Sequence, residues 1–314
     1  MVLEDLLSPE KAESRPGIMV LFGFLYTSIA MLLSLWIFRE YSSLFTVFLA
    51  TIAAVPIIFK LIKMEEQKDL TDMSEKVLLK EHYRALSSFM YLFYGAVLAF
   101  VLWYTVLPSG TVAVLFEAQS STISTINGRT TFLGDPGNLQ TSGTAVTGNA
   151  LAVSTQVTGV TGDVITPFEA LKRIFFNNVK VLIFCILFSF LYGAGAIFIL
   201  LWNASVIGTA IGNFIRTQIA TLALQLGGAT IGGYLSVVSI GLLKYVIHGV
   251  PEILAYFVAA LAGGIISIAI IKHEFNTQKF EHIILDSADL LMLSMVILFI
   301  AAILEVYVTP AVFG

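Results

Sequence analysis

Charged side chains are scarce in this sequence, and their scarcity identifies the solvent. Only 12% of the 314 residues are Asp, Glu, Lys or Arg, against about 25% in an average soluble domain. Hydrophobic residues make up 57% of the chain, and the mean hydropathy is +0.90. A water-soluble core cannot bury that much apolar surface, so the sequence predicts an integral membrane protein with the lipid bilayer as a partner.

Cysteine is almost absent, and so are the signatures of common enzymes. Cys185 is the single cysteine, so no disulfide can form within the chain. The apolar runs hold no HExxH or GxSxG pattern. His248 and Glu252 are two candidate ligands, whereas zinc usually takes three or four. We therefore expect no catalytic residues, no metal, no cofactor and no nucleic-acid partner.

The N-terminal segment lacks the pattern of a secretory signal. Residues 1–17, MVLEDLLSPEKAESRPG, are acidic and mixed, and no small-residue cleavage site follows the long apolar run behind them. Ser8 followed by Pro9 is typical of a helix start. We interpret 1–17 as a short lead-in.

Long apolar runs are abundant. A bilayer core of about 30 Å needs roughly 20 apolar residues as a helix. The sequence predicts an all-α membrane bundle of six to seven spans. The clear runs are 18–38, 44–63, 86–107, 179–201, 204–225 and 286–308.

A further apolar region, 235–271, is too long for one ordinary span and too short for two. His248-Gly249-Val250-Pro251 lies near its middle. Because proline lacks an N–H and disfavours helix at the residue before it, we expect a half-membrane, re-entrant piece at 235–248 and a full span at 251–271. Irregular backbone at that depth must face protein or a wet cavity.

Basic residues predict the orientation. The segment 64–85 reads as a charged cytoplasmic helix at the membrane surface, and the loop 272–285 carries Lys272 and Lys279. Placing both on the cytoplasmic side of a prokaryotic cell membrane follows the positive-inside rule. The N-terminus is then cytoplasmic, 108–171 is external, and a last span follows 272–285. Lys172, Arg173 and Lys180 lie on the external side in this arrangement and count slightly against it, although long basic side chains can snorkel.

The segment 108–171 is rich in Ser, Thr and Gly. Asn127-Gly128 is a strong type I′ hairpin signal, and a similar pattern surrounds Gly148-Asn149. We expect a small β-rich external insertion here, with a flexible loop as the alternative.

Polar groups within the apolar runs are the candidate functional residues, because they are costly in lipid and usually functional or paired. His248 and Glu252 are four residues apart and share a face of a helix. They can form a structural hydrogen-bonded cluster, a proton or ion pathway, or a catalytic pair. The predicted buried polar cluster is His248, Glu252, Asn177, Asn178, Asn203, Arg216 and Lys244.

Arg216 lies centrally in IGNFIRTQIATLAL. A lone arginine at the bilayer centre costs roughly 2.5–3.5 kcal/mol on insertion scales, so a partner is expected. Glu252 and Glu305 are the available carboxylates. The alternative is that Arg216 snorkels to the interface.

Small residues predict where helices approach closely. Gly208 and Gly212 form one GxxxG, and Gly263 continues a small-residue face of a later span. This spacing fits packing within the chain or a homo-oligomer seam. The expected packing glycines are Gly193, Gly208, Gly212, Gly249 and Gly263.

The stretches FNNVKVLIFCILFSFLYGAGAIFILLWNASVIGTAIG and HGVPEILAYFVAALAGG resemble the stage II sporulation protein M family. The resemblance covers roughly 170–271 and rests on Asn177 or Asn178, Gly193, Asn203 and the His248-Gly249-x-x-Glu252 signature. The family usually has proline before the histidine, where this chain has Ile247. The first half looks like archaeal members with an added helical hairpin.

The resemblance implies a polytopic protein that anchors partners in the membrane; in spore formers those partners degrade the cell wall. We therefore expect a scaffold or a subunit of a membrane complex, with an unknown membrane or envelope partner or a second copy of itself. The alternative is an ion channel or transporter lined by the broken region 235–271, since interrupted hydrophobic segments often mark such sites. An intramembrane hydrolase lacks a nucleophile–base set.

Overall fold

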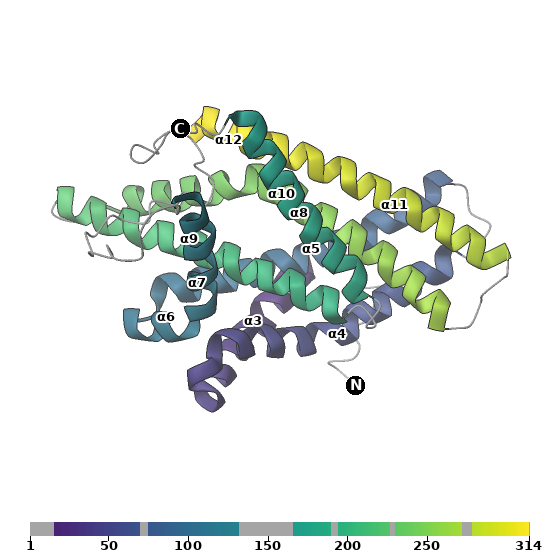
Figure 1. Cartoon of the computed structure of the whole chain (residues 1–314). Coiled ribbons are helices and arrows are strands. Elements are labelled where there is room, and N and C mark those ends of the chain that lie inside the picture. Colours follow the sequence, from purple (N-terminus) through teal and green to yellow (C-terminus); the bar gives the residue numbers. More distant parts are fainter. Residues whose placement is uncertain are drawn as a thin grey trace.

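The computed structural model describes residues 16–69, 75–131, 166–189, 194–226, 230–271 and 278–313. Within these ranges every regular element is helical (Figure 1). The long helices are α3 (Gly17–Ile37), α4 (Ser42–Asp69), α5 (Glu75–Val106), α8 (Pro167–Ser189), α9 (Ala194–Leu226), α10 (Ile231–Ile271) and α11 (Gln278–Ile303). The short elements are η1 (Arg39–Tyr41), α6 (Ser109–Leu115), α7 (Glu117–Thr131), the π-helical turn η2 (Leu304–Val308) and α12 (Thr309–Phe313).

Six stretches of these helices are long and apolar enough to cross a bilayer: 17–37, 39–61, 86–106, 195–224, 231–267 and 280–312. The prediction of an all-α polytopic membrane protein is confirmed at this level. The helix α8 is not among the six, and it carries the three charged side chains Lys172, Arg173 and Lys180. It nevertheless packs along α9, α10 and α11.

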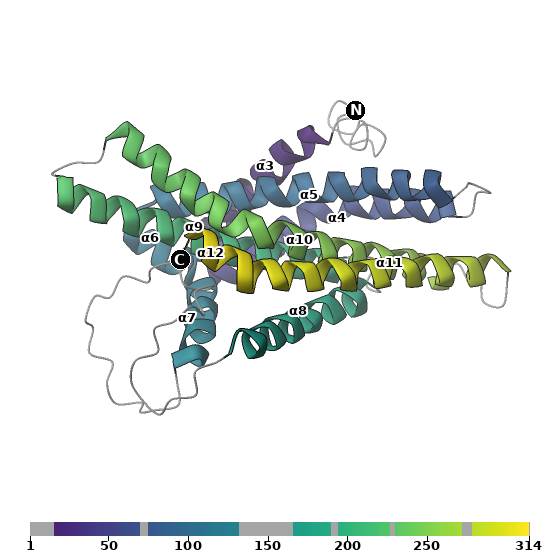
Figure 2. The same cartoon turned by 90° about the horizontal axis from the view of Figure 1, so that it is seen from above.

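The first three predicted spans correspond to α3, α4 and α5. The charged segment 64–85 does not form one separate helix in the described residues. Residues 64–69 continue α4, and 75–85 begin α5. The two helices therefore extend their charged ends together beyond the apolar spans, as a helical pair (Figure 2).

The predicted boundary between the spans 179–201 and 204–225 is displaced. The helix α8 ends at Ser189 and α9 begins at Ala194, so Trp202-Asn203-Ala204 lies inside a helix. The Asn203 side chain donates to the Ile199 carbonyl oxygen of the preceding turn at 2.9 Å. Because the Asn203 amide is hydrogen-bonded within its own helix, the residue can lie inside a span instead of at its end.

The predicted re-entrant break at 235–248 is wrong. Residues 231–271 form one helix, and Pro251 is the 21st of its 41 residues. Figure 1 shows that α10 bends near its middle, as a proline in a helix interior usually causes. Neighbouring helices on several sides let a membrane helix tolerate the missing hydrogen bond, so the proline bends the helix without turning it back.

The β-rich insertion predicted for 108–171 is also not supported. The structure has helices at 109–115 and 117–131, and Asn127-Gly128 lies in α7 instead of a hairpin turn. A helix also begins at Pro167, where Thr166 and Glu169 form a reciprocal capping box: each side-chain oxygen accepts from the other residue's backbone N–H at 3.2 Å. The second expected hairpin, around Gly148-Asn149, lies outside the described residues, as do the helix start at Ser8 and Gly193.

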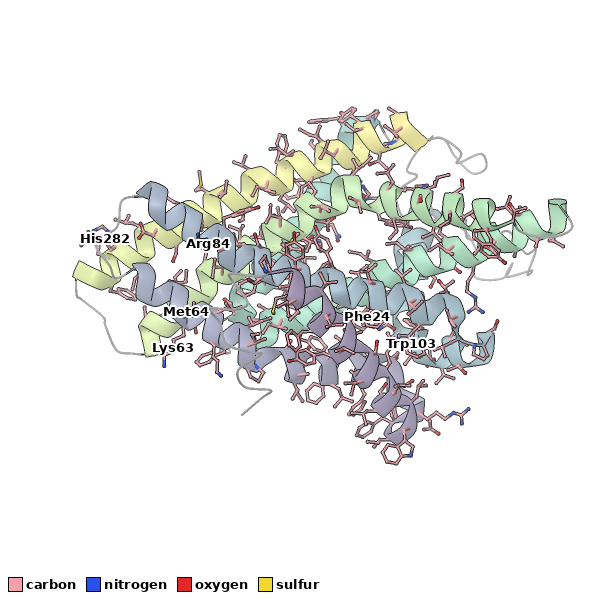
Figure 3. The ribbon with its side chains drawn as sticks, turned by 180° about the vertical axis from the view of Figure 1, so that it is seen from behind. Phe24, Lys63, Met64, Arg84, Trp103 and His282 are labelled. Carbon is pink, nitrogen blue, oxygen red and sulfur yellow. The ribbon has the colours of Figure 1, made fainter. Side chains whose placement is uncertain are left out.

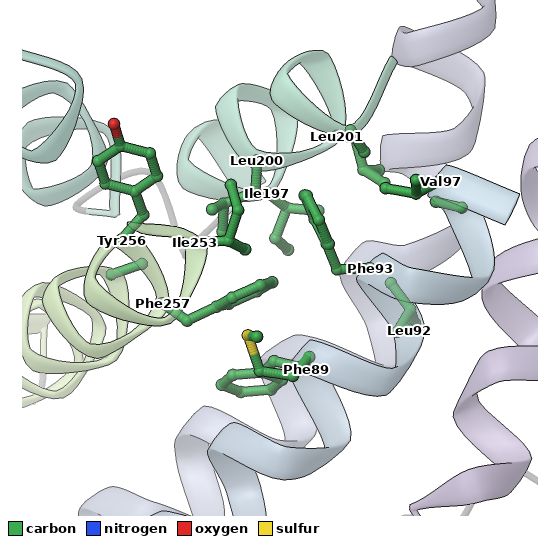
Figure 4. Close-up of a cluster of buried hydrophobic side chains, with 14 of the residues drawn as sticks. Phe89, Leu92, Phe93, Val97, Ile197, Leu200, Leu201, Ile253, Tyr256 and Phe257 are labelled. Atoms are coloured by element: carbon green, nitrogen blue, oxygen red, sulfur yellow. The ribbon is translucent and has the colours of Figure 1, made fainter. Parts of the chain in front are cut away.

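Aromatic and aliphatic side chains of α5, α9 and α10 fill the middle of the bundle (Figure 4). The Phe257 ring stacks on Phe89 and meets Phe93 edge-on, with ring centroids 5.9 Å apart in both pairs. Ile197 and Leu200 approach from α9 and are 4% and 3% exposed. This cluster fixes α10, whose polar face is described below.

The helices α3 and α5 cross at the closest approach of two backbones. A Cβ added at Gly23 would overlap the Leu92 carbonyl, and one added at Gly95 would overlap the Val20 carbonyl. The Trp103 indole N–H donates to Ser28 Oγ across the same interface at 3.0 Å. Glycine is therefore required on both helices for them to approach this closely.

The long helices meet at two opposite ends of the bundle. The α4–α5 and α10–α11 ends lie together, and the α9–α10 end lies opposite (Figures 1 and 2). Lys63, Arg84 and His282 are seen at the first of these ends, whereas Trp103 lies toward the other (Figure 3). Basic side chains lie at both ends: Lys63 and Arg84 on the charged extensions of α4 and α5, and Arg216 at the opposite end of α5.

Candidate functional site

Three polar side chains follow one face of α10 at intervals of four residues: His248, Glu252 and Tyr256. An uninterrupted helix places such residues one above another. His248 is 4% exposed and Tyr256 is fully buried, while Glu252 is partly buried. The continuity of α10 through Pro251 therefore builds the stripe that the sequence pattern suggested.

The imidazole of His248 faces the C-terminal end of the chain. Its Nδ1 lies 3.2 Å from Thr309 Oγ1. Thr309 is 2% exposed, and its hydroxyl also donates to the Leu304 carbonyl oxygen at 3.1 Å, across the π-helical turn. His248 is thus held by a residue 61 positions away in the sequence.

Glu252 faces two partners. Its Oε1 accepts a hydrogen bond of 2.8 Å from the Tyr256 hydroxyl. Its carboxyl group also interacts electrostatically with that of Glu305, which belongs to η2 and is 7% exposed. Tyr256 interacts in the same way with Glu305 and with Cys185 of α8. The site therefore lies where α8, α10 and η2 meet.

The side chains pair in antiparallel order, Thr309 with His248 and Glu305 with Glu252. A π-helical turn is rare and is frequently found at functional sites. Here it carries Glu305 into the bundle, where the carboxyl group has no hydrogen-bond donor among the described residues. Within the described part of the chain no three His, Cys, Asp or Glu side chains are grouped as they would be around a metal ion.

Arg216 lies apart from these carboxylates, so its expected pairing with Glu252 or Glu305 is wrong. Its guanidinium donates to the Tyr104 carbonyl oxygen at 3.1 Å and to Ser109 Oγ at 3.3 Å. Tyr104 lies in the last turn of α5, where carbonyls lack intrahelical donors. A cation at this end also meets the negative end of the helix dipole, so Arg216 caps α5.

A comparison with known families matches residues 18–310 to the model of stage II sporulation protein M. The chain belongs to this family. The match runs well beyond the range 170–271 on which the resemblance rested, and it includes both Glu305 and Thr309. No curated protein and no solved structure matches the chain.

The asparagines that suggested the family take separate places. Asn177 is exposed on α8, whereas Asn178 is buried at 7% exposure. Asn203 bonds within α9. Lys244 lies one turn before His248, is partly buried and interacts electrostatically with the imidazole. Of the predicted polar cluster, only His248, Glu252 and Lys244 share the site on α10.

The predicted packing glycines also differ in what they contact. Gly208 and Gly212 pack on Phe100 and Tyr104 of α5, and Gly263 packs on Ser189 at the end of α8. These contacts are within the chain, which is one of the two alternatives for the small-residue spacing. An added Cβ at Gly249 would meet no atom within 4 Å among the described residues, so Gly249 does not mediate the packing expected of it.

Sequence reasoning missed Tyr256 and Thr309 as members of the site. Tyr256 was detectable, because it continues the four-residue spacing of His248 and Glu252. Thr309 was not, since nothing local to VTPAVFG indicates that its hydroxyl faces a histidine on another helix. Gln119 was missed as well: its Nε2 donates to the Ser43 carbonyl oxygen at 3.2 Å and to Ser205 Oγ at 3.1 Å.

Proposed function

We propose that this protein is a membrane-embedded scaffold, a subunit of a larger complex that presents one end of its bundle to a partner of the envelope. The observation that carries this proposal is the attachment of α7 to the bundle by Gln119. This side chain is 1% exposed and bridges α7 to α4 and α9. The chain leaves α7 toward the Ser/Thr/Gly-rich residues 132–165, so this segment begins from a fixed support.

Further contacts support a fixed frame around that point. Leu115 and Phe116, between α6 and α7, are each 1% exposed, and the Phe116 ring meets Tyr104 edge-on at 5.0 Å between centroids. Arg216 ties the end of α5 to Ser109 at the start of α6. Short elements anchored by buried side chains favour a docking platform over a gate that must move.

The charged extensions of α4 and α5 support an orientation for this frame. Lys60, Lys63 and Arg84 lie in the α4 and α5 segments at the end opposite α6 and α7. Under the positive-inside rule that end faces the cytoplasm of a prokaryotic cell. The N-terminus is then cytoplasmic, while α6, α7 and 132–165 face outward. The helix α8 returns the chain across the membrane as a seventh crossing.

The alternative, a channel lined by a broken helix, lost its main support when α10 proved continuous. A homo-oligomer seam on Gly208, Gly212 or Gly263 is likewise disfavoured, because each of them packs within the chain. A second copy of the protein is one of the partners that the following experiment distinguishes.

Site-specific photo-crosslinking in native membranes tests the scaffold. A crosslinker replaces Ser142, within the external segment, or Met292, which is 69% exposed on the lipid face of α11. We expect a discrete adduct with a second polypeptide at position 142 and lipid adducts alone at 292. An adduct of twice the chain mass would identify a second copy. Lipid adducts alone at both positions would contradict the proposal.

Gln119 provides the structural arm of the same experiment. Gln119→Leu keeps the volume and removes both bridges, at a cost of about 1 kcal/mol for each hydrogen bond. We expect a weaker adduct at 142 in this variant. Glu117→Gln, exposed on the same helix, is the matched control and should leave the adduct unchanged.

A further inference from the structure

Glu252 and Glu305 lie on two packed elements, α10 and η2, each one turn from the hydrogen-bonded pair of His248 and Thr309. Glu305 is 7% exposed and interacts electrostatically with Glu252. Two carboxylates at close range in a low dielectric repel each other strongly, so one of them holds its proton to a higher pH than a lone carboxyl would. Their environments decide which of the two carries it.

The environments of the two glutamates differ in a consistent direction. Glu252 accepts a hydrogen bond of 2.8 Å from Tyr256. A hydrogen bond to a carboxylate stabilises its charged form. Glu305 is 7% exposed and receives no hydrogen bond from any described residue. Leaving a buried carboxylate without a partner costs several kcal/mol, which a protonated carboxyl avoids.

The remaining titratable groups around the pair do not supply the missing charge. His248 lies beside Glu252 on α10, but its Nδ1 is engaged with Thr309. Lys244 is a further turn away and interacts with the imidazole. Cys185 of α8 faces Tyr256 and is fully buried. The Tyr256 hydroxyl is already donated to Glu252.

We propose that Glu252 and Glu305 form one proton-binding site, in which Glu305 carries the proton and donates it to the Glu252 carboxylate. Release breaks the O–H bond of Glu305, transfers the proton to a water molecule and leaves two carboxylates that repel each other. Uptake reverses the step, so no other reactant is needed. This inference does not depend on the scaffold function.

Infrared spectroscopy of the full chain in lipid nanodiscs tests the assignment, because a protonated carboxyl has a carbonyl stretch distinct from that of a carboxylate. Near neutral pH we expect this band in the unmodified protein and its loss in Glu305→Gln. Glu252→Gln should keep the band, shifted in frequency because an amide replaces the carboxylate acceptor. Glu281→Gln, exposed on α11, is the matched control and should change nothing.

A pH titration separates a coupled pair from a lone acid. In Glu252→Gln the neighbouring negative charge is gone, so Glu305 should lose its proton at a pH lower by about one unit or more. Protection of the buried Cys185 from a maleimide verifies that each variant is folded. The proposal is overturned if the unmodified protein lacks the band, if Glu305→Gln retains it, or if the titration midpoint is the same in Glu252→Gln.

Discussion

The crossing of α3 and α5 offers the sharpest test of the packing. An alanine at Gly23 would place its Cβ on the Leu92 carbonyl, and one at Gly95 would place it on the Val20 carbonyl. The atoms in the way are backbone, so no side chain can rotate to make room and the two helices must separate. Such overpacking typically costs about 1–3 kcal/mol. At 1.4 kcal/mol per factor of ten, the unfolding constant rises roughly 5- to 150-fold.

The assay can watch this interface directly. Trp103 donates to Ser28 across it at 3.0 Å, so a Trp36→Phe/Trp202→Phe background leaves one reporter tryptophan at the contact. Denaturant titration in mixed micelles, followed by Trp103 fluorescence, gives the free energy of unfolding. We expect Gly23→Ala and Gly95→Ala to lower it and to shift the Trp103 emission.

The double variant and a matched control complete the test. Once one alanine has separated the helices, the second should cost less than it does alone, giving a coupling energy between the two sites. Gly249→Ala is the control, because no atom lies within 4 Å of the new Cβ. It should change stability by about 0.5 kcal/mol or less. Equal losses at Gly23 and Gly249 would refute the argument from close backbone approach.

Three further predictions address other contacts. Arg216→Gln removes the charged donor from the end of α5 and should lower the free energy of unfolding by about 1.5–3 kcal/mol in the same denaturant titration. Lys63→Gln, which changes an exposed basic side chain, is the control. Equal losses in the two variants would contradict the role of Arg216 as a cap of α5. Thr309→Val removes the partner of His248 Nδ1 at nearly constant volume. It should lower the free energy of unfolding by about 1–3 kcal/mol, because a buried donor or acceptor is left unpaired. Thr309→Ser keeps the hydroxyl and should retain most of this stability; equal losses in the two variants would exclude the hydroxyl as the cause. Cys185, which is fully buried, should react with a maleimide only after denaturation, and rapid labelling of the folded protein would contradict its position between α8 and α10.

Local composition was sufficient to predict the first three membrane spans. The spans at 18–38, 44–63 and 86–107 match α3, α4 and α5 because long apolar runs end at charged or turn-forming residues. The boundary before α9 was misplaced because Asn203 looks like a span end, whereas its amide bonds within its own helix. Polar side chains of this kind cannot be assigned to an end or an interior until their partners are known.

Proline and glycine misled the prediction for the same physical reason. Pro251 reads as a break in an isolated helix, where a lost hydrogen bond is exposed and costly. In α10 the surrounding helices hold the chain on both sides of the proline, and the result is a bend. The signal at Asn127-Gly128 was a local preference that the helix α7 overrides. The glycines with the closest contacts, Gly23 and Gly95, carry no GxxxG spacing at all.

The sequence motif on α10 predicted one part of the candidate site but not the residues that face it. The spacing of His248 and Glu252 correctly places both on one face of α10, and a continuous helix adds Tyr256 to that face. What each side chain meets depends on the C-terminal helix: Thr309 stands opposite the histidine, and Glu305 stands opposite the glutamate. The family match extends to residue 310, so it contains both halves of this arrangement. A signature confined to α10 therefore describes half of a site, and its chemistry follows from the π-helical turn that faces it.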